Sequence, residues 1–488
     1  MSIPEASRNY FKKHPKMENR IFGKTGYSVS AFGFGGYRID YEVEQHSEAL
    51  KYALRNGINL IDTSTNYSDG GSEILVGNVL NELINNKEIE RDEIIVVTKA
   101  GYIQGENFEI AYGKEYNGEP YPGVVKCDEE LWHCIHPDFL CDQISASLQR
   151  MRLKKIDVFL LHNPEYFLSH TNLNDTDELF ELYYRRIEKA FRHLENEAEN
   201  GRISFYGVSS NTFGYPSNYR NFSSLEKMIE IANEIKIDNH FAVVQTPLNL
   251  LEKAAAVIKN QNDNSKTFFE TAVDNNWGIM INRPLNAMNN NKIFKLSNVD
   301  VKINITKEEL DNSIKQLADN EKEIHKTLLK KIDKKLFLPM RECLSVGIDL
   351  SDGLDKYESI DKYIHIKNSM YLSRANFAVG EIKKTLKKQK EIEKLESYYK
   401  NMNYVVEAVE SFFALEINKS KEAVHQLVNE FLDDEKKKLP LSQKALLLVN
   451  SLPQISTTLV GMRKKEYVDD VLKILEYGKI EKAKEYFS

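Results

Sequence analysis

Eight short apolar runs, most of them rich in β-branched residues, alternate with longer helical patterns along this chain of 488 residues. Such alternation is typical of a parallel sheet with crossover helices, and eight strand-helix units close naturally into a barrel. We therefore predict an α/β fold, a (β/α)8 TIM barrel, in which active sites form at the C-terminal ends of the strands. The predicted strands are Ala31–Gly35, Ile58–Asp62, Ile94–Lys99, Ile156–His162, Ser204–Ser209, Phe241–Gln245, Gly278–Asn282 and Ile455–Gly461.

Two further segments extend this barrel. Asn19–Val29, with Gly23 and Gly26 in its middle, predicts an N-terminal β-hairpin that covers the lower end of the barrel. The seventh and eighth runs are much further apart than a usual crossover requires, so we predict a large, mostly helical insertion between strands seven and eight. The predicted divisions are an N-terminal extension (1–18), the barrel through strand seven (19–290), the insertion (291–440), and the last barrel helix with strand eight and the C-terminal helices (441–488).

The insertion begins with an Asn- and Lys-rich stretch, Asn286–Asn298, which predicts an exposed linker. Helical patterns follow at Lys307–Asp333 and Arg374–Asp434. In the second pattern, apolar residues recur at spacings of three and four and predict one apolar helix face; they are Leu395, Tyr398, Tyr399, Met402, Val405, Val406, Val409 and Phe412. We interpret the insertion as a solvated helical addition. Its departure after strand seven, on the active-site side of a barrel, leaves a lid or a specificity wall as the alternative.

Charge and hydropathy argue against several classes of function. Lys and Arg number 66 and Asp and Glu 73, so the net charge of -7 gives no general attraction to nucleic acid or anionic membranes. The longest apolar runs, such as Ala445–Val449, are far shorter than the roughly 20 residues of a membrane-spanning helix. Met1–Arg20 lacks the apolar core of a secretory signal, and four cysteines suit a reducing compartment. We expect a cytoplasmic protein without a nucleic-acid or membrane partner, and the sequence leaves its oligomeric state open.

Four polar side chains lie at or just after the ends of three neighbouring predicted strands. Asp62 ends the second run, Lys99 the third and His162 the fourth, while Tyr67 follows Asp62 in a loop. Because the C-terminal strand ends of a barrel meet at one mouth, we expect these side chains to converge on one pocket. Taken singly, each has an ordinary explanation as a helix cap, a solvated strand end, a loop aromatic or a rim histidine. The presence of all four at neighbouring strand ends favours a catalytic role over these structural ones.

These residue types suit proton transfer to a carbonyl oxygen. A tyrosine with a pKa of about 10 exchanges protons poorly at neutral pH, but a nearby ammonium favours the phenolate and lowers that pKa. We expect Lys99 to act on Tyr67 in this way, and Asp62 to hold Lys99 charged and oriented. His162 would donate a hydrogen bond to a substrate oxygen. Tyr67 would then protonate the alkoxide that forms when hydride reaches a carbonyl.

The motifs around these residues resemble the aldo-keto reductase family. The matching stretches are Gly23–Gly26, Phe32–Tyr37, Ile58–Ser64, Val97–Lys99, Leu160–Glu165 and Gly207–Asn211. The resemblance covers about residues 19–290 and 441–475 and leaves out the insertion. It implies that Asp62, Tyr67, Lys99 and His162 are a catalytic tetrad. It also implies a nicotinamide cofactor, NADP(H), that lies extended across the barrel mouth without a glycine-rich Rossmann loop.

The resemblance further implies which residues bind that cofactor. The nicotinamide carboxamide would be bound by Ser209, Ser210 or Asn211 together with Gln245, although Gln245 also suits a barrel-lining amide. Leu459–Lys465 resembles the last strand and the helix start that holds the adenosine phosphate. There Arg463 or Lys464 would favour NADPH over NADH, unless the segment is an ordinary basic turn. The full predicted set is Gly36, Tyr37, Asp62, Ser209, Ser210, Asn211, Gln245, Asn282, Arg283, Pro284, Leu285, Gly461, Met462, Arg463, Lys464 and Asp470.

The sequence also departs from the family pattern at the cofactor site. Asn282 stands where the family has a tyrosine that stacks on the nicotinamide. We expect the neighbouring Arg283 to stack there instead, where its charge beside an oxidised ring would raise the reduction potential. Val471 stands at the place of an adenine-contacting asparagine, while Asp470 keeps the acidic residue before it.

A long segment after the third strand is expected to shape the substrate pocket. Gly101–Pro137 predicts a loop that overhangs the mouth, with Trp132 and Tyr102 as apolar walls. In or beside it are side chains of types that bind zinc, namely Cys127, His133, Cys134, His136 and Cys141. No C-x-x-C pair is present, so we interpret them as loop residues and buried thiols and predict no metal site.

We therefore predict an NADPH-dependent oxidoreductase that reduces an aldehyde or ketone to an alcohol, or runs in reverse, on a small-molecule substrate. The alternative is a nicotinamide-binding regulatory or scaffold protein, in which the barrel senses the cofactor and the helical insertion binds a partner. Asn282, Val471 and the insertion favour that alternative, whereas the tetrad, with Tyr67 beside Lys99, opposes it.

Overall fold

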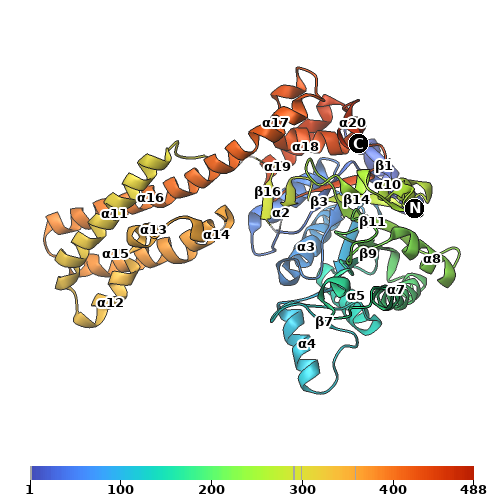
Figure 1. Cartoon of the computed structure of the whole chain (residues 1–488), viewed down its shortest axis with the longest axis horizontal. Helices are drawn as coiled ribbons and strands as arrows, with labels where there is room; N and C mark the ends of the chain where they lie inside the picture. The colour runs from blue at the N-terminus through green and yellow to red at the C-terminus, as the bar shows by residue number, and fades with distance from the viewer. Residues whose placement is uncertain (1–2, 290–291, 298, 300, 358) are drawn as a thin grey trace. The chain divides into compact units, whose positions relative to one another are not determined.

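The computed structural model describes residues 3–289, 292–297, 299, 301–357 and 359–488. It divides into two compact units, the first comprising Met1–Ser297 and Leu427–Ser488 and the second Asn298–Gln426 (Figure 1). Each unit has its own hydrophobic core. Within the described residues, no helix combines the length and the apolar composition that a bilayer crossing requires.

The first unit contains a closed barrel of eight parallel strands, which confirms the predicted fold class. The apolar β-branched runs form these strands because a barrel strand is covered on both faces, by the packed interior and by the outer helices. In the order in which they pair, the strands are β3 (Phe32–Gly35), β4 (Leu60–Asp62), β5 (Ile95–Ala100), β9 (Ile156–His162), β10 (Ile203–Ser209), β11 (Phe241–Pro247), β14 (Gly278–Asn282) and β17 (Thr457–Val460).

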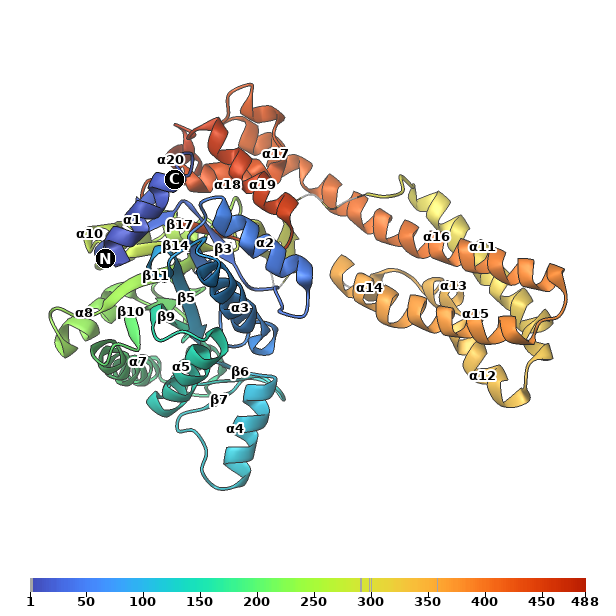
Figure 2. The same cartoon turned by 180° about the vertical axis from the view of Figure 1, so that it is seen from behind.

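Helices surround the barrel on its outer side, as both views show (Figures 1 and 2). The barrel helices are α2 (Glu44–Arg55), α3 (Gly71–Asn85), α5 (Pro137–Met151), α7 (Thr176–Glu199), α8 (Leu225–Ile235), α10 (Phe268–Asp274), α18 (Leu441–Asn450) and α19 (Lys465–Ile474). Four of them, α5, α7, α8 and α10, follow a residue whose side chain caps the helix; Asp175, for example, accepts hydrogen bonds from the backbone N–H groups of Asp177 and Glu178.

The predicted N-terminal hairpin is present and lies at the lower end of the barrel. Strands β1 (Asn19–Ile21) and β2 (Ser28–Ser30) pair antiparallel. Phe22 covers the start of β14, where a Cβ on Gly278 would lie 2.5 Å from the Phe22 ring, so only glycine fits there. Before the hairpin, α1 (Ile3–Lys13) packs against the barrel through the buried Tyr10, which donates to the Leu54 carbonyl oxygen.

Two segments that the sequence presents as irregular carry secondary structure. Gly101–Pro137 contains α4 (Glu106–Tyr116) and a three-stranded sheet of β6 (Tyr102–Ile103), β8 (Trp132–His133) and β7 (Val125–Lys126). The Asn-rich stretch forms a hairpin of β15 (Asn286–Asn289) and β16 (Lys292–Lys295), so the prediction of a linker there was wrong. Its ends are anchored because Ala287 and Leu296 are buried. The predicted boundary at residues 290 and 291 lies outside the described residues.

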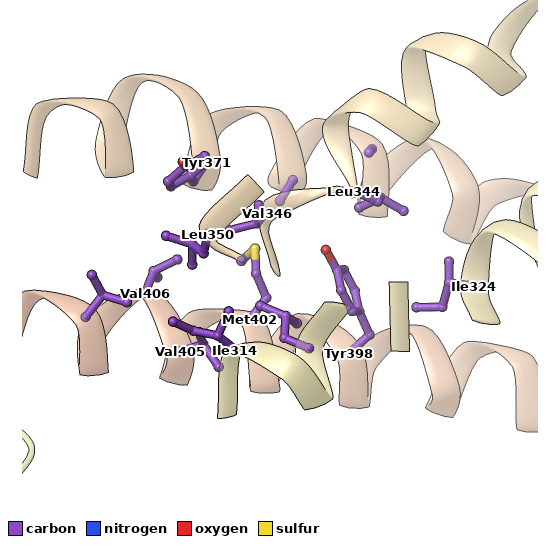
Figure 3. Close-up of a cluster of buried hydrophobic side chains, with 14 of the residues drawn as sticks. Ile314, Ile324, Leu344, Val346, Leu350, Tyr371, Tyr398, Met402, Val405 and Val406 are labelled. Carbon is purple, nitrogen blue, oxygen red and sulfur yellow. The ribbon is translucent and has the colours of Figure 1, made fainter. Parts of the chain in front are cut away.

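The second unit is helical, and its core contains most of the predicted apolar face of α16 (Gln389–Ser420). Figure 3 shows Tyr398 and Met402 of α16 pointing toward Val346 and Leu350 of α13 (Val346–Leu350). Of the predicted face, Tyr399 and Phe412 are only partly buried. The other helices are α11 (Lys307–Thr327), α12 (Lys334–Cys343), α14 (Ile360–Ile366) and α15 (Ser373–Thr385), with a π-helical turn at Lys367–Leu372. Residues 427–440, predicted as part of the insertion, belong to the first unit.

Candidate active site

The register of the barrel strands brings the predicted site residues to one end of the barrel. Asp62 ends β4, Lys99 lies one residue before the end of β5, and His162 ends β9. Across the next strands, Ser209 of β10 is the register partner of both His162 and Gln245. All five side chains therefore lie near the C-terminal ends of their strands, where barrel sites form.

Lys99 and Asp62 form a buried ion pair. Lys99 is 0% exposed, and its Nζ donates to both carboxylate oxygens of Asp62 at 2.7 Å and to the Thr63 carbonyl oxygen at 2.8 Å. These three acceptors use all three ammonium hydrogens. Burial lowers the pKa of Lys99, and the neighbouring Asp62 carboxylate opposes that shift. Asp62 thus orients the ammonium as expected.

Tyr67 lies beside this pair, with its ring centroid 5.0 Å from the Lys99 Nζ. The expectation that Lys99 lowers its pKa was wrong, because burial and the Asp62 carboxylate raise the pKa of Tyr67 well above its ordinary value. The Lys99 ammonium is paired with Asp62, and its attraction for a phenolate does not outweigh these two effects. Tyr67 is therefore held as a protonated phenol at neutral pH.

His162 contacts two tyrosine rings and one serine hydroxyl. Its Nδ1 lies 3.0 Å from the Ser64 Oγ. Its ring meets Tyr67 and Tyr102 edge-on, at centroid distances of 5.9 and 4.7 Å. Burial, with Lys99 and His133 nearby, lowers the pKa of His162 well below its ordinary value, so the imidazole is neutral.

A chain of hydrogen bonds joins three of the predicted cofactor ligands to Asp62. The Gln245 Nε2 donates to Asp62 Oδ1 at 2.8 Å, and the Gln245 Oε1 accepts from Ser209 Oγ at 3.0 Å and from Asn282 Nδ2 at 3.2 Å. The Asn282 Oδ1 is buried and has no hydrogen-bond partner among the described residues. An amide donor placed at the mouth would satisfy this oxygen.

At the end of β3, the backbone comes close to β4 and requires glycine. The Gly36 N–H donates to the Asp62 carbonyl oxygen at 2.8 Å, and a Cβ at position 36 would lie 2.8 Å from Ser72 Oγ. The next residue, Tyr37, is 63% exposed and meets the Tyr67 ring edge-on at 5.2 Å. An exposed aromatic ring next to Tyr67 offers a surface on which a planar group can stack.

The predicted phosphate-binding segment follows β17. Gly461 is exposed and Met462 buried, while Arg463 and Lys464 are exposed and have no ion-pair partner among the described residues. Lys464 precedes the first residue of α19, and N-terminal helix ends favour anions. Two unpaired cations at this position suit a phosphate group.

A comparison of the sequence with models of known protein families identifies the family of this chain. The model of the aldo/keto reductase family matches residues 31–322, which is more than half of the chain. The chain belongs to the aldo/keto reductase family. This confirms the resemblance on which the site residues were predicted.

Individual aldo/keto reductase relatives match only part of the chain. The NADH-specific methylglyoxal reductase of Escherichia coli is 29% identical over 154 residues, 30% of this chain and 42% of that protein. The D-arabinose 1-dehydrogenase of Saccharomyces cerevisiae is 27% identical over 198 residues, 39% of this chain and 45% of that protein. The chain thus spans less than half the length of these curated relatives. An aldo-keto reductase from Bacillus halodurans in its holo form superposes with a TM-score of 0.47 at 14% identity, covering 96% of this chain and 95% of that one.

Arg283, which stands next to the position where the sequence departs from the aldo/keto reductase pattern, forms an ion pair with Glu252 that the sequence did not predict. Arg283 follows β14 with a φ of 51°, in the left-handed region, and its Nη2 donates to Glu252 Oε1 at 2.6 Å. This ion pair offsets the charge that we expected beside the nicotinamide. Pro284 is buried, and the Leu285 carbonyl accepts from the Leu296 N–H at 2.8 Å, so this segment leads directly into the β15–β16 hairpin.

Other predicted residues have contacts outside the tetrad. Val471 is buried on α19, while Asp470 is exposed, with its Oδ1 3.5 Å from the Gln443 Nε2. Trp132 packs against Phe108 of α4 rather than against the tetrad, whereas Tyr102 contacts His162 directly. Among the described residues, no group of His, Cys, Asp or Glu side chains is arranged to hold a metal ion.

Sequence reasoning also gave no role to Glu165, which lies three residues after His162. Its Oε1 accepts from the Asn211 N–H at 2.8 Å, so it supports the turn that carries the predicted carboxamide ligands. Its Oε2 is buried without a hydrogen-bond partner among the described residues. Burial raises the pKa of Glu165 to about 7. A carboxyl group of this kind at a strand end is a further candidate for function.

Proposed function

We propose that this protein is an NADP(H)-dependent oxidoreductase that interconverts a small aldehyde or ketone and the corresponding alcohol. The observation that carries the proposal is the meeting of Tyr67, the Lys99–Asp62 pair and His162 at one mouth of the barrel. A donor, a charged pair and a neutral imidazole within contact of each other are the groups that proton transfer to a carbonyl oxygen requires.

The same mouth offers groups that fit a nicotinamide. The unpaired Asn282 Oδ1 suits the N–H of a carboxamide, and Ser209 and Gln245 lie beside it. The Gly36 N–H donates to the Asp62 carbonyl oxygen, and the exposed Tyr37 ring follows it in the chain. When bound there, the nicotinamide supplies hydride, and the protein supplies position and electrostatics.

Within this proposal, Tyr67 is the proton donor. Its raised pKa keeps the phenol protonated until an alkoxide, which is a far stronger base, forms beside it. Lys99 stabilises the phenolate that remains, through its charge 5.0 Å from the ring. Asp62 holds Lys99 in place, and His162 contacts the substrate through its second ring nitrogen, Nε2.

Arg463 and Lys464 support NADPH over NADH. Both are exposed cations without ion-pair partners among the described residues, at the start of α19, and they suit the additional 2′-phosphate of NADPH. The Escherichia coli relative is named as NADH-specific, so this preference rests on the two side chains and not on the relative. Four free cysteines support a reducing, cytoplasmic setting for the reaction.

The test is a titration of the purified chain with NADPH and NADH, followed by the decay of reduced-nicotinamide absorbance with a panel of aldehydes and ketones. We expect NADPH to bind more tightly and to be consumed. Tyr67→Phe keeps the ring but loses the proton, so turnover should fall by about 10² to 10⁴ while NADPH affinity is kept. NADPH binding with no turnover in the unaltered chain would favour a cofactor sensor, and no binding of either cofactor would contradict the proposal.

A further inference from the structure

The second unit, Asn298–Gln426, has a pocket of about 430 Å³, a volume typical of small-molecule sites. Three segments surround it: the end of α12 with the turn that follows, the start of α13, and the π-helical turn with the start of α15. Two of its lining residues, Val346 and Tyr371, are buried in the hydrophobic core shown in Figure 3. Two others, Leu338 and Met370, are 59% and 36% exposed. The pocket therefore offers apolar surface to a small ligand.

Two arginines line the same pocket. The second unit contains many lysines but only two arginines, and both of these, Arg341 of α12 and Arg374 of α15, are in the lining. Burial raises the pKa of the Cys343 thiol, and the charge of Arg374 opposes that shift, so Arg374 lies near Cys343 in this lining. Neither guanidinium group has an ion-pair or hydrogen-bond partner within the part of the chain that the structure describes.

The acidic residues of the pocket do not neutralise both arginines. Asp349 is already engaged, because it accepts a hydrogen bond from the Tyr371 hydroxyl and pairs with Lys356 at 3.1 Å. The other carboxylate of the lining belongs to Glu342, which is exposed. Two unpaired guanidinium charges and this one carboxylate leave one positive charge. The pocket therefore suits a ligand with a single negative charge.

Arginine is also the cation best suited to bind a carboxylate. Its planar guanidinium group donates two parallel hydrogen bonds to the two carboxylate oxygens, and such charge-assisted bonds are stronger than neutral ones. A ligand with a carboxylate at one end and an apolar chain at the other would satisfy the arginines and cover the apolar lining in the same pocket.

We propose that the second unit binds a small organic carboxylate with an apolar chain in this pocket, and that Arg341 and Arg374 bind its carboxylate group. The site lies wholly within the second unit, so the proposal does not rest on the chemistry of the barrel.

The probe is octanoate, titrated into the full chain and followed by calorimetry. Octanamide has the same chain without the charge, and acetate has the charge without the chain. We expect both to bind at least about tenfold more weakly than octanoate, because each loses one of the two kinds of contact. Equal affinity for octanoate and octanamide would overturn the proposal. Tighter binding of inorganic phosphate than of octanoate would overturn the carboxylate class.

Cys343 shows whether octanoate binds in this pocket, because it lines the pocket and is the one cysteine of the second unit. Its alkylation by iodoacetamide is followed by mass spectrometry, with the partly exposed Cys127 and Cys141 of the barrel unit as internal references. We expect the alkylation rate of Cys343 to fall in proportion to the occupied fraction, while the rates of the references stay unchanged. Octanoate binding that leaves Cys343 unprotected would overturn the proposal.

Variants of the two arginines test their role. Arg341→Gln and Arg374→Gln each remove one guanidinium group, and each should weaken octanoate binding by about tenfold. Lys400→Gln is the matched control, because it removes the same charge from an exposed position of α16 outside the pocket lining. Arginine variants that bind octanoate as tightly as Lys400→Gln would overturn the assignment. If neither arginine variant folds, the octanoate and octanamide affinities and the Cys343 protection of the unaltered chain remain decisive.

Discussion

At the scale of single residues, Glu165 gives the site a dependence on pH. The raised pKa of about 7 means that its carboxyl is mostly neutral below pH 7 and ionised above it. Glu165 supports the Asn211 turn, where the nicotinamide carboxamide is proposed to bind. Oxidised nicotinamide is positively charged and reduced nicotinamide is not, so only the oxidised form gains from an ionised Glu165.

We therefore predict that affinity for NADP⁺ relative to NADPH rises as the pH rises through 7. A Coulomb attraction of about 1 kcal/mol, the value for two charges roughly 15 Å apart at an effective dielectric constant of about 20, would change the affinity ratio by about fivefold between pH 6 and pH 8. Glu165→Gln keeps an oxygen for the Asn211 N–H and removes the titration, so its affinity ratio should not vary with pH. Dissociation constants of both cofactors at the two pH values measure this, with the exposed Glu178→Gln as control. The same pH dependence in Glu165→Gln would exclude Glu165 as the titrating group.

The positions of strand ends in the sequence were enough to predict some of the site residues but not their contacts or pKa values. Asp62, Lys99 and His162 were predictable because each ends an apolar run, and barrel geometry brings such ends together. The contact of Ser64 with His162 joins residues 98 positions apart and leaves no trace in either local pattern. The pKa of Tyr67 was predicted in the wrong direction, because the sequence shows which charges are near but not that burial outweighs them.

At the scale of elements, local patterns predicted strands better than they predicted irregular segments. The runs that became β9 and β14 were predicted with their observed bounds, since they are apolar, short and bounded by polar residues. The β15–β16 hairpin was missed because its Asn and Lys residues have the composition of a linker. What makes it a hairpin is the burial of Ala287 and Leu296, which depends on the surrounding fold.

The helical unit depends on one buried carboxylate between its elements. Glu321 of α11 accepts from the N–H groups of Gly347 and Ile348 at 2.9 Å each and from the Tyr398 hydroxyl at 3.1 Å. Glu321→Ala would leave these donors buried and unpaired, which should lower the free energy of unfolding of this unit by about 3 kcal/mol. Glu323→Ala is the matched control on the same helix, with a side chain 60% exposed. Denaturant unfolding measures both, and equal stability losses would contradict the role given to Glu321.

At the scale of the whole molecule, the two units differ in a way that spectroscopy can follow. The chain has two tryptophans, Trp132 and Trp277, and both belong to the unit that contains the barrel. Tryptophan fluorescence therefore reports the barrel unit alone, whereas far-ultraviolet circular dichroism also reports the helices of Asn298–Gln426. Because each unit has its own core, we predict two unfolding transitions by circular dichroism and one by fluorescence.

The cofactor should act on only one of these transitions. The groups proposed to hold it, from Gly36 to Asn282 and again from Gly461 to Lys464, all belong to the barrel unit. NADP⁺ at a hundredfold its dissociation constant should stabilise that unit by about 2.7 kcal/mol. It should shift the fluorescence transition and leave the transition seen only by circular dichroism in place, while Glu321→Ala should do the reverse. A single transition that both probes report together, and that NADP⁺ moves as a whole, would show that the barrel and the helical unit unfold as one cooperative structure.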